Sequence, residues 1–459
     1  MKKKKILLLS DDLRMHSGIA TMSREIILNT VKEFDWVQLG AALQHPDHGK
    51  VFDVSADVRK QTGVEDANVK IYAHTGYGNP DILRQLIQAE QPDAIMHFTD
   101  PRFWLWLYQM EHEIRQMMPL MYYTIWDDTP YPMYNKTFYE SCDLLMCISK
   151  QTYNIVRNVI KDAQYKDWQI SYVPHGINPT QFYPITEDST EWSEYLNFKN
   201  NLIGDKAEFV IFHNNRNIRR KHTSDLILAY KKFCDKLTKE QADKCMLLLH
   251  TDPIDENGTN LPAVITALCP DYRVSFTNKR MLTTKELNYL YNLSDVTANI
   301  ASNEGFGLST AESLMAGTPI IVNVTGGLQD QCGFTKDNGE YLTEHDYTDN
   351  MQTNADRYFK EHGSWCTPVF PAVRTLQGSV PTPYIFDDIV DYNEVADAIH
   401  QWYLLSKEEI KLRGKLGREF LMLTETGLSA PEMGNRFIAS MNNCFENWTP
   451  RNRFELHKI

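Results

Sequence analysis

Two carboxylates eight positions apart, Glu304 and Glu312, flank a glycine-containing turn that leads into a helical pattern ending at Gly317. Backbone amides at the start of a helix bind anions such as a diphosphate, and glycine lets the backbone approach a ligand closely. Carboxylates beside a bound anion are best matched by neutral hydroxyl groups, such as those of ribose or a sugar ring. The stretch therefore predicts a sugar-nucleotide site. The amides expected to contact the diphosphate are those of Gly305, Phe306, Gly307 and Leu308.

A purely structural interpretation of the same residues is also available. Ser309-Thr-Ala-Glu312 fits a capping box, in which the Glu312 side chain reaches back to the amide of Ser309. Glu304 would then be a solvated loop acid. The other motifs of the chain favour the binding role.

Four cations lie within six residues directly after the expected strand Phe209–His213, in the sequence Arg216-Asn-Ile-Arg-Arg-Lys221. A diphosphate that departs as its bond breaks needs preorganised positive charge, which Arg216 and Lys221 are expected to provide. Arg219 and Arg220 are expected to face solvent. A solvated charged turn is the alternative, but the position at the carboxyl end of a buried strand favours the binding role.

A second phosphate-compatible turn follows the expected first strand, Ile6–Ser10, and contains Gly18. It has one glycine and lacks the three-glycine dinucleotide fingerprint, so a nicotinamide or flavin oxidoreductase loses its main support. An ordinary connection between a strand and a helix is the alternative.

Aromatic residues are concentrated in the first part of the chain, where most are expected in the core. Trp126-Asp127-Asp128 follows the expected strand Leu120–Thr124, so the indole could stack on a sugar or a base. Asp100 lies at a similar strand end. Together with Asp127 or Asp128, it could accept hydrogen bonds from the hydroxyl groups of an acceptor.

The chain has 459 residues and a net charge of -13, which predict two or three domains and argue against a protein that coats nucleic acid. Lys2 to Lys5 precede an apolar run too short for a signal peptide or a membrane span, and we expect no integral membrane segment. The eight cysteines show no metal-binding or C-x-x-C spacing. They indicate reduced thiols in a cytoplasmic protein.

Short apolar runs alternate with helical patterns in two successive series, which predicts an α/β fold with two Rossmann-like, doubly wound domains. Such domains bind ligands beyond the carboxyl ends of their strands, so two facing domains would form a cleft. We expect an N-terminal domain over 1–185, a second domain over 186–428 with an insertion at about 331–385, and a terminal helix within 429–459 that crosses back to the first domain. The other expected strands are Ala94–Phe98, Leu144–Ile148, Ile170–Val173, Met246–His250, Val274–Thr277, Val296–Ile300 and Ile320–Val324.

Four ordered motifs resemble those of the retaining GT-B glycosyltransferases of family four, also described as glycosyl transferases group 1. Leu290-Tyr-Asn-Leu-Ser-Asp295-Val leads to the Glu-x7-Glu pair, which is followed by Ala-Gly317-Thr-Pro. Cys142-Asp-Leu-Leu-Met-Cys-Ile-Ser-Lys150 is similar to a strand of that family, and Tyr172-Val-Pro-His-Gly-Ile-Asn-Pro-Thr-Gln-Phe182 to its interdomain hinge. The resemblance extends from about residue 5 to 324 and resumes near residue 384.

The resemblance implies that Glu312 binds the ribose hydroxyls and that Glu304 faces the hydroxyls of the donor sugar. Arg216, Lys221 and the amides after Glu304 would hold the diphosphate, and Gly18 would approach it from the other domain. The implied reaction is glycosyl transfer from a nucleotide-diphosphate sugar with retained anomeric configuration, commonly without a metal or other cofactor. The leaving phosphate oxygen would help to deprotonate the acceptor.

Two departures from the family pattern concern the diphosphate and the sugar. Asn215-Arg216-Asn-Ile-Arg-Arg-Lys221-His222 keeps both cations of the corresponding motif but replaces both glycines. Trp126 stands where the family often has a histidine, for which His16 and His97 are nearby alternatives, although His97 better fits a core histidine.

The acceptor class stays open among a glycan, a lipid-linked sugar and a hydroxylated base of DNA. Two other functions also stay open, a nucleotide-sugar epimerase of the same architecture and a non-catalytic nucleotide-sugar-binding protein.

Overall fold

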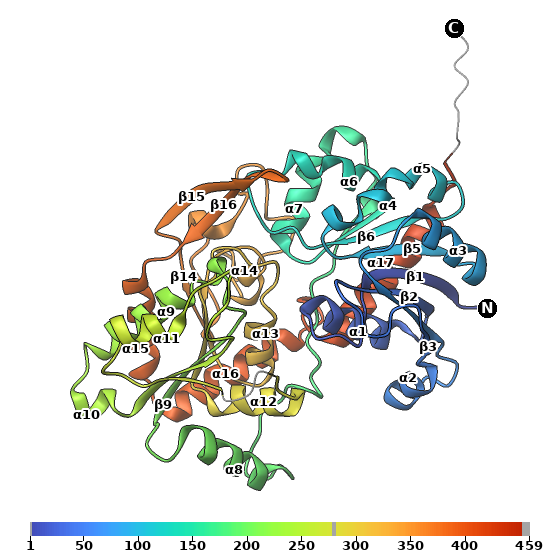
Figure 1. Ribbon diagram of the computed structural model, residues 1–459. Coiled ribbons are helices and arrows are strands. Elements are labelled where there is room, and N and C mark those ends of the chain that lie inside the picture. Colours follow the sequence, from blue (N-terminus) through green and yellow to red (C-terminus); the bar gives the residue numbers. More distant parts are fainter. Residues whose placement is uncertain (1, 278–280, 452–459) are drawn as a thin grey trace. The chain divides into compact units, whose positions relative to one another are not determined.

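The computed structural model describes residues 2–277 and 281–451, and these form two compact units (Figure 1). Unit 1 comprises Met1–Gly176, Ser379–Pro383 and Ala430–Ile459. Unit 2 comprises Ile177–Gly378 and Tyr384–Ser429. The first boundary falls at Gly176, whereas the sequence-based boundary is at residue 185. Both units are sheets covered by helices, which confirms the predicted α/β class.

Unit 1 contains an eight-stranded sheet with the strand order β3-β4-β2-β1-β5-β6-β7-β8. Neighbouring strands are parallel except for β3, which pairs with β4 in the antiparallel direction. The chain runs outward from β1 on both sides, so the loops that follow β1 and β5 meet at a topological switch point. The strands are β1 (Lys4–Asp11), β2 (Phe34–Ala42), β3 (Val51–Asp53), β4 (Val69–Thr75), β5 (Ala94–Phe98), β6 (Leu120–Thr124), β7 (Leu144–Cys147) and β8 (Ile170–Tyr172).

The helices of unit 1 begin at recognisable caps. Ser17 accepts a hydrogen bond from the amide of Ala20 at the start of α1. The C-terminal helix α17 packs against α1, and a side chain at Gly434 would meet Asn29 at 2.8 Å or less. The helices are α1 (Gly18–Thr30), α2 (Ser55–Thr62), α3 (Pro80–Glu90), α4 (Leu105–Gln109), α5 (Glu111–Ile114), α6 (Lys136–Glu140), α7 (Lys150–Val159) and α17 (Ala430–Asn447), with short 3-10 turns η1 (Pro101–Trp104), η2 (Met133–Asn135), η3 (Lys161–Ala163) and η4 (Asp167–Gln169).

Unit 2 contains a parallel six-stranded sheet with the order β11-β10-β9-β12-β13-β14. Its switch point lies between β9 and β12, which pair directly through Ile211 and Val296. A separate hairpin, β15 and β16, completes the strands. They are β9 (Phe209–Asn214), β10 (Cys245–His250), β11 (Val274–Phe276), β12 (Val296–Asn299), β13 (Ile320–Asn323), β14 (Cys366–Val369), β15 (Val373–Ser379) and β16 (Thr382–Ile389).

The sheet of unit 2 is covered by helices whose ends are again marked by caps. Thr283 and Glu286 form a capping box at the start of α12. The helices are α8 (Trp192–Ile203), α9 (Thr223–Cys234), α10 (Lys239–Ala242), α11 (Leu261–Leu268), α12 (Thr284–Leu293), α13 (Leu308–Met315), α14 (Leu328–Gln331), α15 (Tyr392–Tyr403) and α16 (Lys407–Met422), with 3-10 turns η5 (Arg219–Lys221) and η6 (Asn354–Asp356).

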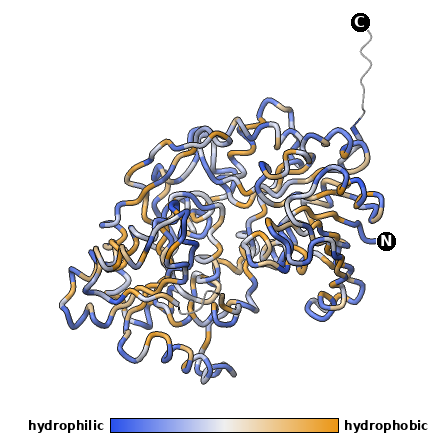
Figure 2. The backbone as a smooth tube through the Cα atoms, in the orientation of Figure 1, coloured by the Kyte–Doolittle hydropathy of each residue, from blue (hydrophilic) through white to orange (hydrophobic). Residues whose placement is uncertain are grey.

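The central strands of both sheets are almost completely buried, as expected for parallel sheets with helices on both faces. Figure 2 shows hydrophobic stretches along these strands and hydrophilic ones along outer loops. Every strand expected from the sequence is present, but β2, β3, β4, β14, β15 and β16 were not expected. The apolar run of β2 is interrupted by Gln38, which is buried and donates from its amide nitrogen to Ser10 Oγ and the Asp11 carbonyl at 2.8 Å.

The segment 331–385 is not a simple insertion, which corrects the sequence-based expectation. Its residues Cys366–Val369 form β14, the edge strand of the sheet, and pair with β13 in parallel. Its later residues enter the hairpin of β15 and β16. In the part of the chain that the structure describes, no helix has the length and apolarity needed to cross a membrane.

Candidate functional site

The loops that follow β9 and β12 bring Lys221 and Glu304 together at the carboxyl edge of the second sheet. Lys221 ends the 3-10 turn η5, and Glu304 lies between β12 and α13. The Lys221 ammonium donates to Glu304 Oε2, and the two side chains are 7% and 13% exposed. Two charges that are 83 positions apart in the sequence thus form a largely buried ion pair, as the parallel pairing of β9 with β12 allows.

The electrostatic surroundings keep Glu304 ionised. Burial alone raises the pKa of this carboxyl, but the charges of Lys221 and Arg220 outweigh that effect and lower it below its usual value. Asn299 Nδ2 adds a contact of 3.5 Å. Arg220 was expected to face solvent, and its side chain is exposed, yet its guanidinium also donates to the carbonyl of Asn303. It therefore supports the loop that carries Glu304.

Backbone geometry fixes the turn between Glu304 and α13. Gly307 has a φ of 88°, and a side chain there would meet Leu328 Cδ2 at 2.4 Å, so the position requires glycine. The Gly327 amide donates to the Glu304 carbonyl at 2.8 Å, and the Gln331 amide nitrogen donates to the Phe306 and Gly307 carbonyls. Because the first amides of a helix have no partner within it, those at the start of α13 point out of the helix toward a possible anion.

Glu312 does not form the capping box that the sequence allows. The helix begins at Leu308 with Gly307 as its N-cap and no side-chain cap, so Ser309 does not occupy the capping position. The Glu312 carboxylate instead accepts a hydrogen bond from Tyr291 Oη at 2.7 Å. Burial raises the pKa of Glu312 to about 7, although the Tyr291 hydroxyl lowers it in part. The capping interpretation of Glu312 is therefore wrong for this conformation.

Arg216 lies apart from the buried pair. Its side chain is 63% exposed, and its Nε donates to Asp255 Oδ2 at 3.0 Å. Arg219, exposed as expected, borders a cavity of about 190 Å³ beside the N-terminus of α9, together with His222 and Gly258. The structure thus pairs Lys221 with Glu304 in the loop that leads into α13 and places Glu312 on that helix, while Arg216 lies at the surface.

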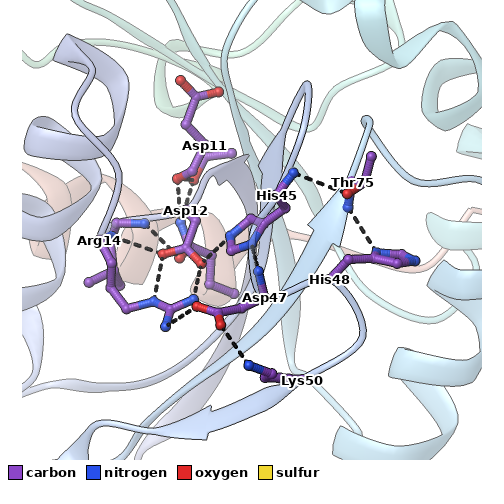
Figure 3. A network of polar contacts seen from close by, with 11 residues as sticks. Asp11, Asp12, Arg14, His45, Asp47, His48, Lys50 and Thr75 are labelled. Atoms are coloured by element: carbon purple, nitrogen blue, oxygen red, sulfur yellow. Dashed lines mark hydrogen bonds and ion pairs between the residues drawn. The ribbon is translucent and has the colours of Figure 1, made fainter.

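In unit 1, the loop after β1 is held by a network of polar contacts (Figure 3). Asp12 is completely buried and accepts hydrogen bonds from Arg14 Nη2 at 2.7 Å and from His45 Nε2 at 3.0 Å. The amide of Asp47 donates to His45 Nδ1, so the proton of this imidazole lies on Nε2 and points to Asp12. His16, on the loop that this network supports, and Gly18, at the start of α1, are both exposed.

The residues expected on the acceptor side lie at the carboxyl ends of β5 and β6. Asp100 caps the turn η1 and forms an ion pair with Arg102, whose guanidinium lies 5.6 Å from the centre of the Trp126 ring. The indole nitrogen of Trp126 donates to the Asp128 carbonyl at 2.9 Å, and the Asp127 carbonyl accepts from the Gln151 amide. Gln151 is buried, and the other side chains are partly exposed.

His97 is a core residue, as the sequence suggested. It is fully buried, its Nδ1 lies 2.7 Å from Tyr108 Oη, and burial lowers its pKa to about 3. Three other residues of these edges were not singled out from the sequence. Tyr291 belongs to the Leu-Tyr motif before Asp295. Asp12 and Arg14 lie two positions apart directly after a strand, and an aspartate often bonds the backbone two residues further on in a turn. These local signals could have identified them, whereas the partner of each lies far away in the sequence.

Residues 195–350 match the family described as glycosyl transferases group 1. A trehalose synthase from Thermococcus litoralis is 27% identical over 202 residues, which are 40% of this chain and 48% of that protein. An uncharacterized glycosyltransferase from Methanocaldococcus jannaschii is 24% identical over 197 residues, or 42% of this chain and 45% of that protein. The chain thus spans about half the length of the curated relatives it matches.

Solved structures resemble this chain over nearly its whole length. Sucrose-phosphate synthase from Thermosynechococcus elongatus has a TM-score of 0.64 at 16% identity and covers 97% of this chain and 100% of its own. HepE from Anabaena, in complex with UDP and glucose, has a TM-score of 0.61 at 13% identity, with 96% and 99% covered. At such identities the likeness concerns the fold. The predicted resemblance is thereby confirmed, and this chain has the GT-B fold and carries a glycosyl transferases group 1 domain.

Proposed function

We propose that the protein transfers a sugar from a nucleotide-diphosphate sugar to a hydroxyl group of an acceptor, with retention of the anomeric configuration. The observation that carries this proposal is the buried pair of Lys221 with Glu304 in the loop that leads into α13, together with Glu312 on that helix, all within the matched residues 195–350. A cation, a helix N-terminus and two carboxylates in different electrostatic states suit the parts of a sugar nucleotide.

In the proposed step, the bond between the anomeric carbon and the phosphate oxygen breaks, and its electron pair leaves with the diphosphate. The acceptor oxygen bonds to the same face of the anomeric carbon, and its proton passes to the leaving phosphate oxygen. Negative charge on the diphosphate is stabilised by Lys221 and by the amides of 305–308. Arg216 leaves Asp255 and contacts the diphosphate as well. Its ion pair with Asp255 is weak because the Arg216 side chain is exposed.

The two carboxylates have separate roles in this proposal. Glu304, kept ionised by Lys221 and Arg220, accepts hydrogen bonds from the hydroxyls of the donor sugar. Glu312 accepts those of the ribose. The protein cations supply the charge for the leaving group, and the proposed reaction needs no metal ion or other cofactor.

The acceptor is proposed to contact unit 1 through Trp126, Asp127, Asp100 and His16, with Gly18 near the donor. A glycan or smaller sugar is the first acceptor class to test, because the relatives include a trehalose synthase and the similar structures a sucrose-phosphate synthase. A lipid-linked sugar and a hydroxylated DNA base are the other classes. The eight cysteines remain thiols, which supports a reducing, cytoplasmic location.

The proposal is tested by incubating the protein with a panel of nucleotide sugars and following the products by mass spectrometry. UDP-glucose is the first donor to test, since HepE is bound to UDP and glucose. Each donor is supplied alone and then with pooled glycans, lipid-linked sugars or modified DNA. Transfer that depends on an acceptor supports the proposal. Conversion of the donor alone to an isomer would indicate an epimerase, and binding without any turnover would indicate a non-catalytic protein.

A further inference from the structure

The two oxygens of the Glu312 carboxylate have different surroundings. Oε2 accepts the hydrogen bond from Tyr291 at 2.7 Å. Oε1 contacts no hydrogen-bond partner within residues 2–277 and 281–451. The side chain is partly exposed, so a ligand can reach it. One oxygen is therefore held by the protein and the other is available.

Tyr291 is itself held rigidly. It is completely buried in α12, and its ring packs edge-on against Phe212 at 5.4 Å and Phe182 at 5.9 Å between ring centres. Its backbone carbonyl accepts from Thr318 Oγ1 at 2.7 Å, which ties α12 to the turn after α13. The ring therefore has little freedom to follow a moving carboxylate.

The direction of the Tyr291 hydroxyl is fixed by a second contact. Asn214, the last residue of β9, donates from Nδ2 to Tyr291 Oη at 3.0 Å. Since a phenol has a single proton and its oxygen here accepts from Asn214, the proton points to Glu312. A chain of two hydrogen bonds thus runs from the end of β9 through α12 to α13.

We propose that Tyr291, oriented by Asn214, is a positioning residue that holds Glu312 Oε2 so that Oε1 meets a ribose hydroxyl of the bound nucleotide. This inference rests on the proposed function and names two residues that the reaction would need without their touching the reacting atoms. A carboxylate already fixed in place loses less rotamer entropy when the nucleotide binds.

The hydroxyl also keeps the carboxylate charged. Burial raises the pKa of Glu312, and the Tyr291 hydrogen bond opposes this rise. Without the hydroxyl, this pKa rises further and more of the carboxyl is protonated at neutral pH, which weakens its hydrogen bond to the ligand. Charged groups near α13 include Lys221 and Glu304, which contact each other, and Asp330 of α14. Arg418 of α16 donates to the Met315 carbonyl, and α12 and α16 carry further charged side chains such as Lys285, Glu286 and Lys415.

The test uses Tyr291→Phe in the full chain, with Tyr289→Phe as the matched control. Tyr289 lies on the same helix and loses the same hydroxyl, but its ring packs against Tyr195 and Phe198 rather than near Glu312. The dissociation constants of UDP, ADP and GDP are measured by calorimetry between pH 6 and pH 9, and melting temperatures are recorded for each protein.

For a nucleotide that the unmodified protein binds, Tyr291→Phe should weaken binding about tenfold at pH 7. In this variant, the pH at which binding reaches half its limiting strength should move upward. The difference in affinity between the variant and the unmodified protein should become smaller toward pH 9. Tyr289→Phe should bind as the unmodified protein does. Equal weakening at every pH would indicate a structural role only and would overturn the inference, as would unchanged binding.

Asn214→Ala provides a second variant if Tyr291→Phe does not fold. It should weaken binding about threefold at pH 7, since it removes the group that orients the hydroxyl but keeps the hydroxyl itself. Unchanged affinity in Asn214→Ala would show that Asn214 does not orient the Tyr291 hydroxyl for nucleotide binding. Failure of the unmodified protein to bind any of the three nucleotides would count against the proposed function, whereas normal binding with no effect of either variant would count against this inference alone.

Discussion

The carboxyl edges of the two sheets are held by charges in different ways. In unit 2, Lys221 and Glu304 are 83 residues apart and join two loops in a largely buried pair. In unit 1, the pair of Asp100 with Arg102 joins residues two positions apart, and Asp12 meets Arg14 at the same spacing. The charge pair of the unit 2 edge is therefore a long-range one, whereas these two pairs of unit 1 are local, although Asp12 also accepts a hydrogen bond from His45 of the loop after β2.

This difference predicts which edge tolerates substitutions in its loops. A change in one loop of unit 2 leaves a buried charge in the other loop without its partner, which is costly. A loop of unit 1 that brings its own counter-charge can be altered with less effect on its neighbour. The match to glycosyl transferases group 1 correspondingly covers residues 195–350, all in unit 2.

Breaking the long-range pair should have the largest effect. Lys221→Met should lower turnover on the order of a thousandfold, because the leaving diphosphate loses its buried cation. It should also lower the free energy of unfolding by about 3–5 kcal/mol, because Glu304 stays buried and unpaired. Steady-state kinetics and denaturant titration measure both.

Two further variants sharpen this result. Lys221→Met combined with Glu304→Gln should recover most of the stability but none of the turnover. Arg102→Met in unit 1 breaks a local, partly exposed pair and should cost less than about 1 kcal/mol of stability. Similar stability losses in Lys221→Met and Arg102→Met would erase the contrast between the two edges.

The surface cation of unit 2 gives the next largest effect. Arg216→Ala should reduce turnover on the order of a hundredfold if its guanidinium moves to the leaving diphosphate. Arg219→Ala, which removes an equally exposed arginine three positions away, should remain near the unmodified rate. Unchanged turnover in Arg216→Ala would restrict the diphosphate site to Lys221 and the backbone amides.

The unit 1 edge should control the acceptor alone. Trp126→Ala should raise the KM for the acceptor about tenfold through the loss of stacking. Slow hydrolysis of the donor without acceptor should stay the same, and Trp126→Phe should recover part of the acceptor affinity. A Trp126→Ala protein whose donor hydrolysis falls as strongly as its transfer would assign the indole to the donor.

The second carboxylate of unit 2 predicts a pH effect on stability. The pKa of Glu312 is raised to about 7 in the folded protein, so its proton stabilises the fold at low pH, and this contribution is lost as pH rises from the unfolded value to about 7. Relative to Glu312→Gln, the unmodified protein should therefore lose about 3 kcal/mol of stability between pH 4.5 and pH 8. Parallel stability curves from denaturant titrations would show that Glu312 is ionised throughout. Glu312→Ala should also weaken nucleotide binding by more than twofold.

The smallest effect is expected from the removal of metal ions. If Lys221 and Arg216 supply the positive charge, EDTA should leave turnover within about twofold of its starting value. Addition of Mg²⁺ or Mn²⁺ after dialysis is the control. A large loss that either ion restores would assign part of that charge to a metal.

Much of the fold could be predicted because parallel strands buried on both faces leave apolar runs such as Ala94–Phe98 and Phe209–Asn214. The strand β2 was not predicted because Gln38 interrupts its apolar run. The side-chain amide of Gln38 donates to Ser10 and Asp11 of the neighbouring strand and accepts from the amide of Leu13. A hydrogen bond between strands that are distant in sequence leaves no periodic signal.

The candidate site could likewise be predicted only in part from the sequence. The loop positions of Lys221 and Glu304 follow from the strands before them, but their contact depends on the pairing of β9 with β12. The choice of Glu312 between a capping box and a ligand could not be made from Ser309-Thr-Ala-Glu312, because the helix start at Gly307 depends on a left-handed backbone and on Leu328. In the structure, the Glu312 carboxylate accepts a hydrogen bond from Tyr291 of another helix, α12.

The position of helix α17 has a consequence for folding during synthesis on the ribosome. Unit 1 begins with the first residues of the chain, yet Ala430–Asn447 packs on α1, with Gly434 close to Asn29. All of unit 2 is synthesised before this helix emerges. One flank of α1 therefore stays uncovered until α17 has been synthesised, whereas unit 2 is complete before that point. Unit 1 thus begins before unit 2 in the sequence and is completed after it.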